Sequence, residues 1–324
     1  LFMERLINYE QEVKPEIIVI AGDLLHNHER LHTLALNKAY DMVNDMRLIC
    51  KTYVLVGNHD YSNNQQFLSQ NHWLNGMKEW KNTIIVDKVM SETIHSQKFI
   101  FVPYVPPGRF QDALNTLDGE WKDASCIFAH QEFAGCKMGA IVSVEGDKWP
   151  LDNPPVISGH IHSRQSPQPN IYYSGSAMQH AFGESEKNII ACLTFQNGHY
   201  TNEEIDLKLP RKRIVYMDVE DVENYTVPDT QDKVKVTITG SYEQFKALKK
   251  TKKYKDIIKK GKTKIVFKPK KLIEKDIISN TDKESTFTTI LNSLIIQEKS
   301  SYLTQAYELI VNEKQTGLED VMFL

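Results

Sequence analysis

Short polar motifs follow several apolar runs in the N-terminal part of the chain, and their residue types are those of metal ligands. The motifs are Gly22-Asp23 after residues 17–21, Gly57-Asn58-His59-Asp60 after 53–56, His130 after 126–129, Gly159-His160-Ile161-His162 after 156–158 and Gly175-Ser176 after 171–173. Carboxylate, amide and imidazole groups together suit manganese, iron or zinc, whereas magnesium and calcium prefer ligand sets made only of oxygen. The motifs therefore predict a site for transition-metal ions.

The spacing of these groups favours a pair of ions. The carboxylate of Asp23 can bridge two ions about 3.5–4 Å apart, the separation that two-metal phosphoryl-transfer enzymes use. Asn58 adds an oxygen ligand without adding charge. His160 and His162 stand at positions i and i+2, so on an extended segment they share a face and each can serve a different ion.

The apolar runs that precede the motifs are typical of β-strands, because Val, Ile, Phe and Tyr dominate them. The expected strands cover residues 17–21, 53–56, 83–86, 99–105, 126–129, 156–158, 171–173 and 189–195. Between them, residues 29–46 and 110–117 repeat apolar side chains at helical spacing. Most of the strands are apolar on both faces, which predicts buried sheets covered by helices in a layered α/β fold. In α/β sheets the carboxyl ends of the strands are where sites form.

The pattern changes after residue 203. Alternating strands are expected at 213–219, 233–239 and 263–267, with one basic helix at 241–259. Two amphipathic stretches, at 287–294 and 303–310, predict a pair of helices. We therefore expect a layered α/β domain at 1–203, a small α+β domain at 204–271 and a helical segment at 272–324.

Composition limits the class of protein. Of the 324 residues, 41% are hydrophobic and 25% are charged, as in soluble globular proteins. No apolar run approaches the roughly 18 residues that a membrane span needs. The cysteines Cys50, Cys126, Cys136 and Cys192 are scattered and include no CxxC pair. They indicate reduced thiols in a cytosolic or nuclear protein, not a disulfide framework.

Positive charge is concentrated in one segment. From Lys246 to Lys271 there are thirteen lysines and a single acid, Asp256, although the whole chain has a net charge of −3. Clustered lysines suit contacts with nucleic-acid phosphates that do not depend on base sequence. The alternative is a solvated helix and an edge strand whose lysines discourage sheet pairing. The acidity of the remaining chain favours a DNA-binding segment.

The order of the motifs, GD, GNHD, H and GHxH, resembles that of the calcineurin-like metallophosphoesterase superfamily. Within it, Gly22-Asp23-Leu24-Leu25-His26 resembles the GDLFH motif of the Mre-type double-strand-break repair nucleases, whose bacterial counterpart is SbcD. The resemblance covers nearly the whole chain. It implies a sandwich of two β-sheets flanked by helices, a small α+β capping domain and C-terminal helices.

The resemblance also implies roles for individual residues. Asp23 would bridge two metal ions, manganese above all. The remaining ligands would be Asn58, His130 and His160 on one ion and His162 on the other. The catalytic residues would be His59, which protonates the leaving oxygen or steadies the phosphate, Asp60, which orients His59, and His26, which lies near the second ion.

One family motif is missing. The superfamily opens with a DxH motif that supplies further ligands to the first ion, and no DxH stands upstream of Asp23. Phe2, Leu6, Tyr9 and Val13 recur at helical spacing from the first residues onward. We therefore expect the missing motif to precede Leu1, and the sequence as it stands to bind the first ion weakly.

The function that the resemblance implies is a manganese-dependent DNA exonuclease and endonuclease. The C-terminal helices would dock on the coiled-coil base of an ABC-type ATPase, and the N-terminal helices would form a homodimer. Two alternatives remain open. One is a phosphomonoesterase or cyclic phosphodiesterase for small substrates, which leaves the lysines without a purpose. The other is a non-catalytic DNA-end scaffold, against which the intact GNHD and GHxH motifs argue.

Overall fold

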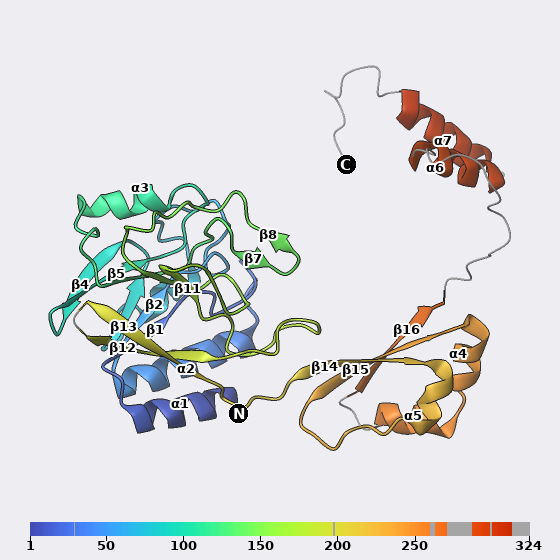
Figure 1. Cartoon of the computed structure of the whole chain (residues 1–324), viewed down its shortest axis with the longest axis horizontal. Coiled ribbons are helices and arrows are strands. Elements are labelled where there is room, and N and C mark those ends of the chain that lie inside the picture. Colours follow the sequence, from blue (N-terminus) through green and yellow to red (C-terminus); the bar gives the residue numbers. More distant parts are fainter. Residues whose placement is uncertain (29, 197, 260–262, 271–286, 299, 313–324) are drawn as a thin grey trace. The chain divides into compact units, whose positions relative to one another are not determined.

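The computed structural model describes residues 1–28, 30–196, 198–259, 263–270, 287–298 and 300–312. The chain forms two compact units, Leu1–Pro269 and Lys270–Leu324 (Figure 1). The domain boundaries expected at residues 203/204 and 271/272 stay predictions.

Two β-sheets make up the body of the first unit. The first sheet has three parallel strands in the order β1-β2-β3, which are Ile17–Ile20, Lys51–Leu55 and Thr83–Val86. The second sheet has six strands in the order β10-β11-β9-β6-β5-β4. Their bounds, in that order, are Gln165–Gln168, Ile171–Tyr173, Val156–Ser158, Cys126–Ala129, Gln97–Val102 and Met90–Ile94. The four inner strands are parallel, and β10 and β4 are antiparallel edges.

Helices and hairpins complete the body. The helices are α1 (Phe2–Val13), α2 (Thr33–Ile49) and α3 (Phe110–Leu114), with 3-10 turns η1 (Trp73–Met77) and η2 (Asn115–Leu117). The hairpins are β7 (Lys137–Met138) with β8 (Ile141–Val142), and β12 (Ile190–Gln196) with β13 (His199–Ile205).

Apolar layers hold the sheets and helices together. Between the two sheets, Tyr53 of β2 stacks on Phe101 of β5, with ring centroids 4.1 Å apart. Helix α2 and η1 cover the outer face of the first sheet, where Val43 and Leu74 pack. Helix α3 covers the outer face of the second sheet through Phe110. These layers confirm the expected α/β sandwich of two sheets flanked by helices.

Strand β6 shows why apolar and polar residues do not alternate along the inner strands of the second sheet. All four of its residues are buried. Cys126 and Phe128 face the core between the sheets, whereas Ile127 and Ala129 face the layer that includes α3. A strand covered on both sides needs apolar side chains at every position.

Residues 212–269 form a smaller part of the first unit, which we call the basic lobe. Its strands β14 (Lys212–Asp218), β15 (Lys233–Gly240) and β16 (Thr263–Pro269) form a parallel sheet. Its helices are η3 (Val219–Asn224), α4 (Tyr242–Leu248) and α5 (Lys252–Lys259). A capping box starts α4, because Ser241 and Gln244 each bind the other's backbone N–H.

The prediction of one helix over residues 241–259 was wrong. Helix α4 ends at Leu248, and α5 begins at Lys252. The hydroxyl of Thr251 donates to the Leu248 carbonyl at 2.8 Å and accepts from the backbone N–H of Tyr254 at 3.2 Å. Threonine thus offers the backbone local partners that compete with a continuous helix, and its side chain caps the second one.

The second unit contains α6 (Phe287–Gln297) and α7 (Ser301–Asn312), which contact each other. This confirms the expected pair of C-terminal helices. Among the described residues, no helix has both the length and the apolar character needed to cross a membrane.

Glu10 of α1 is a buried carboxyl group that makes the fold sensitive to pH. It is 6% exposed, and its Oε2 has no hydrogen-bond partner among the described residues. Burial raises the pKa of Glu10 from 4.5 to about 7. The unfolded chain ionises above pH 4.5 while the folded chain still holds the proton. Stability that Glu10 contributes at low pH is therefore lost as the pH rises from about 4.5 to 7.

Glu10→Gln should raise the free energy of unfolding above pH 7 by up to about 3 kcal/mol, because glutamine is neutral throughout. At pH 4 the variant and the wild type should match. Denaturant unfolding at both pH values measures this difference. Glu12→Gln, at an exposed position of the same helix, is the control and should change little. An equal gain at pH 4 and pH 8 would contradict the account.

Candidate metal centre

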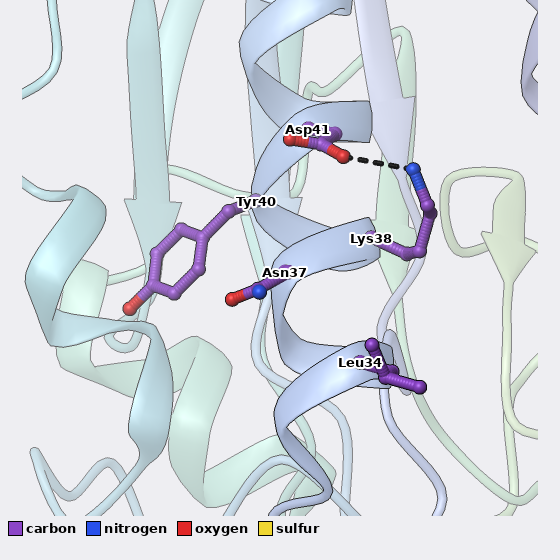
Figure 2. Close-up of a pocket in the computed structure, with 5 residues that line it drawn as sticks. All are labelled: Leu34, Asn37, Lys38, Tyr40 and Asp41. Carbon is purple, nitrogen blue, oxygen red and sulfur yellow. Dashed lines mark hydrogen bonds and ion pairs between the residues drawn. The ribbon is translucent and has the colours of Figure 1, made fainter.

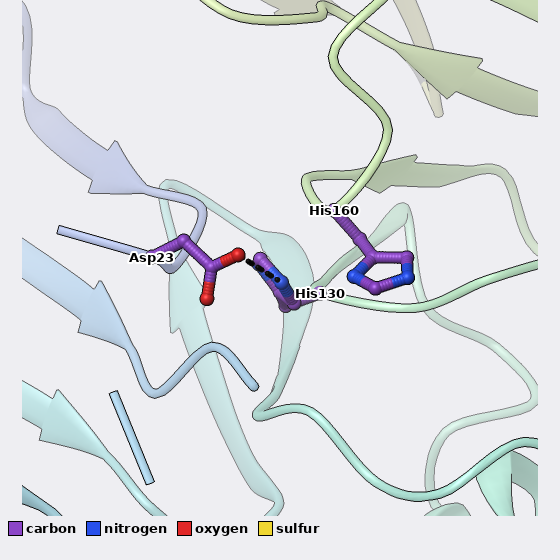
Figure 3. A group of neighbouring side chains, drawn as sticks. All are labelled: Asp23, His130 and His160. Atoms are coloured by element: carbon purple, nitrogen blue, oxygen red, sulfur yellow. Dashed lines mark ion pairs between the residues drawn. The ribbon is translucent and has the colours of Figure 1, made fainter. Parts of the chain in front are cut away.

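Four potential metal ligands meet where the carboxyl ends of strands from both sheets come together. Asp23 follows β1 and Asn58 follows β2 in the first sheet, whereas His130 follows β6 and His160 follows β9 in the second. Figure 3 shows Asp23, His130 and His160 converging from three separate segments of the chain. The sandwich therefore brings together residues that are up to 137 positions apart, from Asp23 to His160.

The donor atoms of these side chains point at one another. Nε2 of His130 lies 3.3 Å from Oδ2 of Asp23 and 3.0 Å from Oδ1 of Asn58. Nδ1 of His160 lies 3.0 Å from the same Asn58 oxygen. The ligand atoms of Asp23, His130 and His160 all lie within 4.8 Å of one another. One carboxylate, one amide oxygen and two imidazole nitrogens thus surround a common point.

Neighbouring groups fix the orientation of these ligands. Nδ1 of His130 donates to the carbonyl oxygen of Ala21 at 2.6 Å, which leaves Nε2 facing the site. Nδ2 of Asn58 donates to Oδ1 of Asn64 at 3.3 Å, which turns the amide oxygen of Asn58 toward the histidines. Outer partners of this kind set the tautomer and direction of metal-binding side chains.

Burial and charge keep His160 and Asp23 in forms that bind a cation, whereas, against the effect of burial, Asp23 raises the pKa of His130, from which a bound ion would have to displace the proton. Burial, together with the neighbouring His130, lowers the pKa of His160 to about 3, so its imidazole is neutral at neutral pH. Burial opposes ionisation of Asp23, but His130 outweighs it and leaves the pKa of that carboxyl below its usual range. An ionised carboxylate beside a neutral imidazole is a donor set suited to a divalent ion.

The backbone is strained at two of these residues. Asp23 has φ 55° and His160 has φ 76°, in the left-handed region that non-glycine residues rarely occupy. Such conformations cost free energy and persist only where the surrounding structure fixes them. Seven other described non-glycine residues, Lys14 and Leu68 among them, also have positive φ, so the ligand geometry and not the strain identifies the site.

The glycines of the motifs are needed for close approach. A Cβ at Gly57 would lie 2.2 Å from Oδ1 of Asp23 and 2.4 Å from its backbone nitrogen. A Cβ at Gly22, where φ is +92°, would lie 2.2 Å from Nδ1 of His130. No other residue fits at either position without moving a ligand.

Gly57→Ala should therefore disturb the site more than the fold. The added methyl group pushes Asp23 away, so the stabilisation that divalent metal gives in a thermal melt should shrink or vanish. The overpacking itself should cost about 1–3 kcal/mol. Gly76→Ala is a matched control, since its Cβ would meet only the Tyr40 hydroxyl, at 3.1 Å. A full metal-induced shift in Gly57→Ala would contradict this assignment.

His59 lies beside the cluster but is not part of it. Its backbone N–H donates to Oδ1 of Asp23 at 2.9 Å, and its Nδ1 is buried without a partner among the described residues. The rings of His26 and His28 each lie 5.0 Å from its ring. Burial lowers the pKa of His59, and His28 and His26 lower it further, against the opposite influence of Asp23.

Asp60 acts on the backbone and not on the His59 ring. Its Oδ2 accepts from the backbone N–H of Asp23 at 2.8 Å and of Gly57 at 2.9 Å. Its Oδ1 accepts from the indole N–H of Trp73 at 3.0 Å. In the described part of the chain, no hydrogen bond joins Asp60 to the His59 imidazole, and the expected role of Asp60 in orienting His59 stays a prediction. Asp60 thus ties the two ligand loops of the first sheet together.

His162 is placed apart from the other ligands. Its side chain is 51% exposed, and its Nδ1 lies 3.7 Å from Oε1 of Glu184. Its ring is 5.1 Å from that of His180. His162 thus does not join the cluster around Asp23, and its expected role as a ligand of a second ion stays a prediction.

Three neighbours of the site were not singled out from the sequence. Glu132 lies 3.9 Å from Nε2 of His160 through Oε2. The ring of Tyr104 lies 6.2 Å from that of His130 and 5.9 Å from that of His160. Trp73 binds Asp60, as described above. Only Glu132 carried a signal, because it follows His130 by two residues.

Two cavities lie near these elements. One, of about 700 Å³, is lined by His26, Asn27, His28, Arg30, His32 and His59. The other, of about 510 Å³, lies on α2 and is shown in Figure 2, with Leu34, Asn37, Lys38, Tyr40 and Asp41. In the second cavity Lys38 and Asp41 neutralise each other at 3.0 Å, and none of the metal-ligand candidates lines it. The first cavity is the one that adjoins the catalytic candidates.

Known proteins are similar to this chain in sequence. The model of the calcineurin-like phosphoesterase family matches residues 2–164. A protein of Invertebrate iridescent virus 6 named as phosphoesterase 244L is 53% identical over 243 residues, which is 73% of this chain and 86% of that protein. A protein of Invertebrate iridescent virus 3 named as phosphoesterase 078R is 45% identical over 299 residues, or 91% of this chain and 86% of that one.

The family assignment and the geometry agree. Calcineurin-like phosphoesterases use divalent metal ions, and the converging donors of Asp23, His130 and His160 fit such an ion. The matched segment contains every candidate ligand and His59. The chain is a phosphoesterase of the calcineurin-like family.

Proposed function

We propose that the chain is a metal-dependent nuclease of the Mre type that hydrolyses phosphodiester bonds in DNA. The observation that carries this proposal is the cluster of Asp23, Asn58, His130 and His160 beside the unpartnered imidazole of His59. Next to His59 lies a cavity lined by nitrogen-rich side chains. Metal ligands, a separate proton donor and a cationic approach are what phosphodiester cleavage requires.

The four clustered side chains would hold the ion. A bound divalent ion would supply charge for the phosphate oxygens and lower the pKa of a water molecule. Asp23 contributes the negative charge, and its position is set by Asp60 through the backbone. The mixture of oxygen and nitrogen donors favours manganese over magnesium. His162 is the ligand that we assign to a second ion.

His59 would donate a proton to the leaving oxygen. Its backbone N–H donates to Asp23, whereas Nδ1 of its imidazole has no partner among the described residues. The imidazole can therefore contact the substrate. His26, whose ring lies 5.0 Å away, is placed to contact the same phosphate. An imidazole buried next to a phosphate dianion or monoanion gains a proton more easily, which suits a general acid.

The surroundings favour a polyanionic substrate over a small one. The cavity is lined by Arg30 and by four histidines, one of which is His59 itself. The basic lobe presents exposed lysines on β16, namely Lys264 and Lys268. Lysines at the surface make phosphate contacts that do not depend on base sequence. A small phosphate ester would use none of them.

A protein partner would bind the second unit. Leu294 of α6 is 53% exposed, and Tyr302 and Leu303 of α7 are 77% and 42% exposed. Apolar side chains on a helical pair fit a helix-in-groove contact, here with the coiled-coil base of an ABC-type ATPase. Leu294→Asp and Leu303→Asp should abolish binding to such a coiled coil, measured by calorimetry, while cleavage by the chain alone is unchanged.

Four scattered cysteines fit a reducing cytosolic or nuclear compartment.

The test is cleavage of labelled linear duplex and single-stranded DNA with manganese, beside hydrolysis of p-nitrophenyl phosphate. We expect DNA to be degraded in a metal-dependent way that EDTA stops. Hydrolysis of the small ester with intact DNA would replace the nuclease by a small-substrate phosphoesterase. DNA binding without hydrolysis of either substrate would make the protein a scaffold.

A further inference from the structure

The sheet of the basic lobe has one covered face and one open face. Helices α4 and α5 and the turn η3 pack on the covered face, against Val236 and Ile238 of β15 and Ile265 of β16. Side chains alternate along a strand, so residues one position away point to the other side. Phe267 of β16 also lies on the covered face, since its ring stacks on Phe245 at 4.3 Å.

The strand register defines the open face. Tyr216 of β14 pairs with Thr237 of β15, which pairs with Val266 of β16. In the next rows, Lys235 pairs with Lys264, and Thr239 pairs with Lys268. None of these residues belongs to the apolar core of the lobe, although Thr237 in the central strand is only 7% exposed. We call this surface the lysine face, and its members are Tyr216, Lys233, Lys235, Lys264, Val266 and Lys268.

The lysine face is strongly positive. The lysine face carries four lysines, and the other outward positions of the three strands add Lys212 and a single acid, Asp218. Lys233, Lys264 and Lys268 are exposed. Neither Lys264 nor Lys268 has a salt bridge in the part of the chain that the structure describes. Residues two apart on a strand lie about 6.6 Å apart, so this face presents regularly spaced cations.

An exposed aromatic ring lies among these lysines. Tyr216 of β14 is 71% exposed. The strand register aligns it with Thr237 of β15 and, beyond that, with Val266 of β16. A single exposed tyrosine is ordinary, but here it is part of a sheet with cations in the adjacent rows. Aromatic rings that stack on bases, beside a positive track for the backbone, are the elements of single-strand binding surfaces. A duplex, whose bases are stacked internally, would leave Tyr216 without a role.

The lysine face is connected to the metal site through one loop. Nζ of Lys235 lies 6.0 Å from the ring centre of Phe182, and the backbone N–H of Lys212 donates to Oε1 of Gln179 at 2.7 Å. The same loop carries His180, whose ring is 5.1 Å from that of His162. Residues 179–182 therefore link the lysine face to His162, the ligand that we propose for a second ion.

We infer that the open face of the β14–β16 sheet is a binding platform for single-stranded DNA, with Tyr216 stacking on a base and Lys235, Lys264 and Lys268 following the backbone. The inference rests on the proposed nuclease function and names its substrate-binding surface. It assigns the contact to the sheet, not to the lysine-rich helices α4 and α5 on the other side.

The test is fluorescence anisotropy of the full chain with a labelled oligothymidine of about 20 nucleotides, in EDTA so that no cleavage occurs. Tyr216→Ala should weaken binding roughly fivefold or more, the lower end of the contribution of base–aromatic stacking. Tyr216→Phe should bind as the wild type does. Lys264→Glu with Lys268→Glu should also weaken binding and reduce the slope of log K against log salt by about 1.4.

The lobe offers matched controls on its other side. Tyr242 of α4 is 66% exposed, so Tyr242→Ala controls for loss of an exposed ring. Lys252→Glu with Lys255→Glu on α5 controls for charge reversal at exposed positions. Control variants that weaken binding as much as the face variants would overturn the inference, as would wild-type affinity in Tyr216→Ala. Thermal melts check that each variant is folded.

A separate assay, DNA cleavage with manganese, tests the proposed nuclease function. Wild-type protein that cleaves DNA but loses no affinity through Tyr216→Ala refutes the platform alone. Wild-type protein that cleaves no DNA refutes the nuclease. Hydrolysis of bis-p-nitrophenyl phosphate should be equal in the wild type and the face variants, because that substrate is too small to span from the metal site to the lysine face.

Discussion

His59→Ala should lower phosphodiester hydrolysis by about 10²- to 10⁴-fold, the usual contribution of a general acid, and leave metal affinity unchanged. The reason is geometric. The His59 imidazole borders the ligand cluster, yet its Nδ1 has no partner among the described residues and its backbone alone contacts Asp23. Calorimetric titration with manganese, together with rates on a DNA substrate, measures both quantities.

A control variant and a chemical rescue complete this experiment. His95→Ala, at a side chain that is 75% exposed and remote from the motifs in sequence, should change neither rate nor metal affinity. Added imidazole should restore part of the rate to His59→Ala, because the small molecule can replace a missing proton donor. If metal affinity falls in parallel with the rate, His59 is a ligand and the assignment of its role is wrong.

Asp23→Asn should abolish metal binding as well as hydrolysis. Asparagine keeps the shape of the side chain but removes the one carboxylate of the cluster, which faces Nε2 of His130 at 3.3 Å. Because partners outside the ligand shell alone contribute 10- to 100-fold to metal affinity, loss of a central ligand should cost more than about 100-fold. Calorimetry with manganese gives the affinity directly.

Asp87→Asn is a matched control for the loss of a buried charge. Asp87 also faces a buried histidine, with Oδ2 3.3 Å from Nε2 of His72, but it pairs with Lys78 and lies outside the ligand cluster. This control should lower stability and leave metal affinity as it was. Equal metal affinity in Asp23→Asn and the wild type would remove Asp23 from the site.

The strands that carry the motifs could be predicted from the sequence because burial on both sides leaves a simple signal. The bounds expected for Thr83–Val86, Cys126–Ala129, Val156–Ser158 and Ile171–Tyr173 match the structure. Convergence of Asp23, Asn58, His130 and His160 was also foreseeable, since each follows the carboxyl end of a strand. What the sequence could not show is that the ends of two different sheets meet, through the contact of His130 with the Ala21 carbonyl.

Other features depended on tertiary contacts or on weak local signals. Strands β4 and β10 are short edges of the second sheet and have mixed polarity, so no periodicity marked them. Strand β13 was missed although Asn197-Gly198 is a strong hairpin signal between it and β12. The break between α4 and α5 depends on one threonine in a lysine-rich run.

The roles of single side chains were harder to foresee than their places. Asp60 follows His59 in the chain, which made an orienting contact a natural expectation. In the fold its carboxylate points toward backbone N–H groups of both ligand loops. His162 shares a motif with His160, but the left-handed backbone at His160 turns the chain, and His162 lies beside Glu184 and His180. Residue spacing on an ideal strand cannot anticipate such a turn.

The most direct test of the metal centre is a crystal of the full chain soaked in manganese and measured by anomalous scattering. We expect a peak enclosed by Asp23, Asn58, His130 and His160, with His59 outside the coordination sphere. A peak bound elsewhere, or none with these four side chains still facing one another, would contradict it.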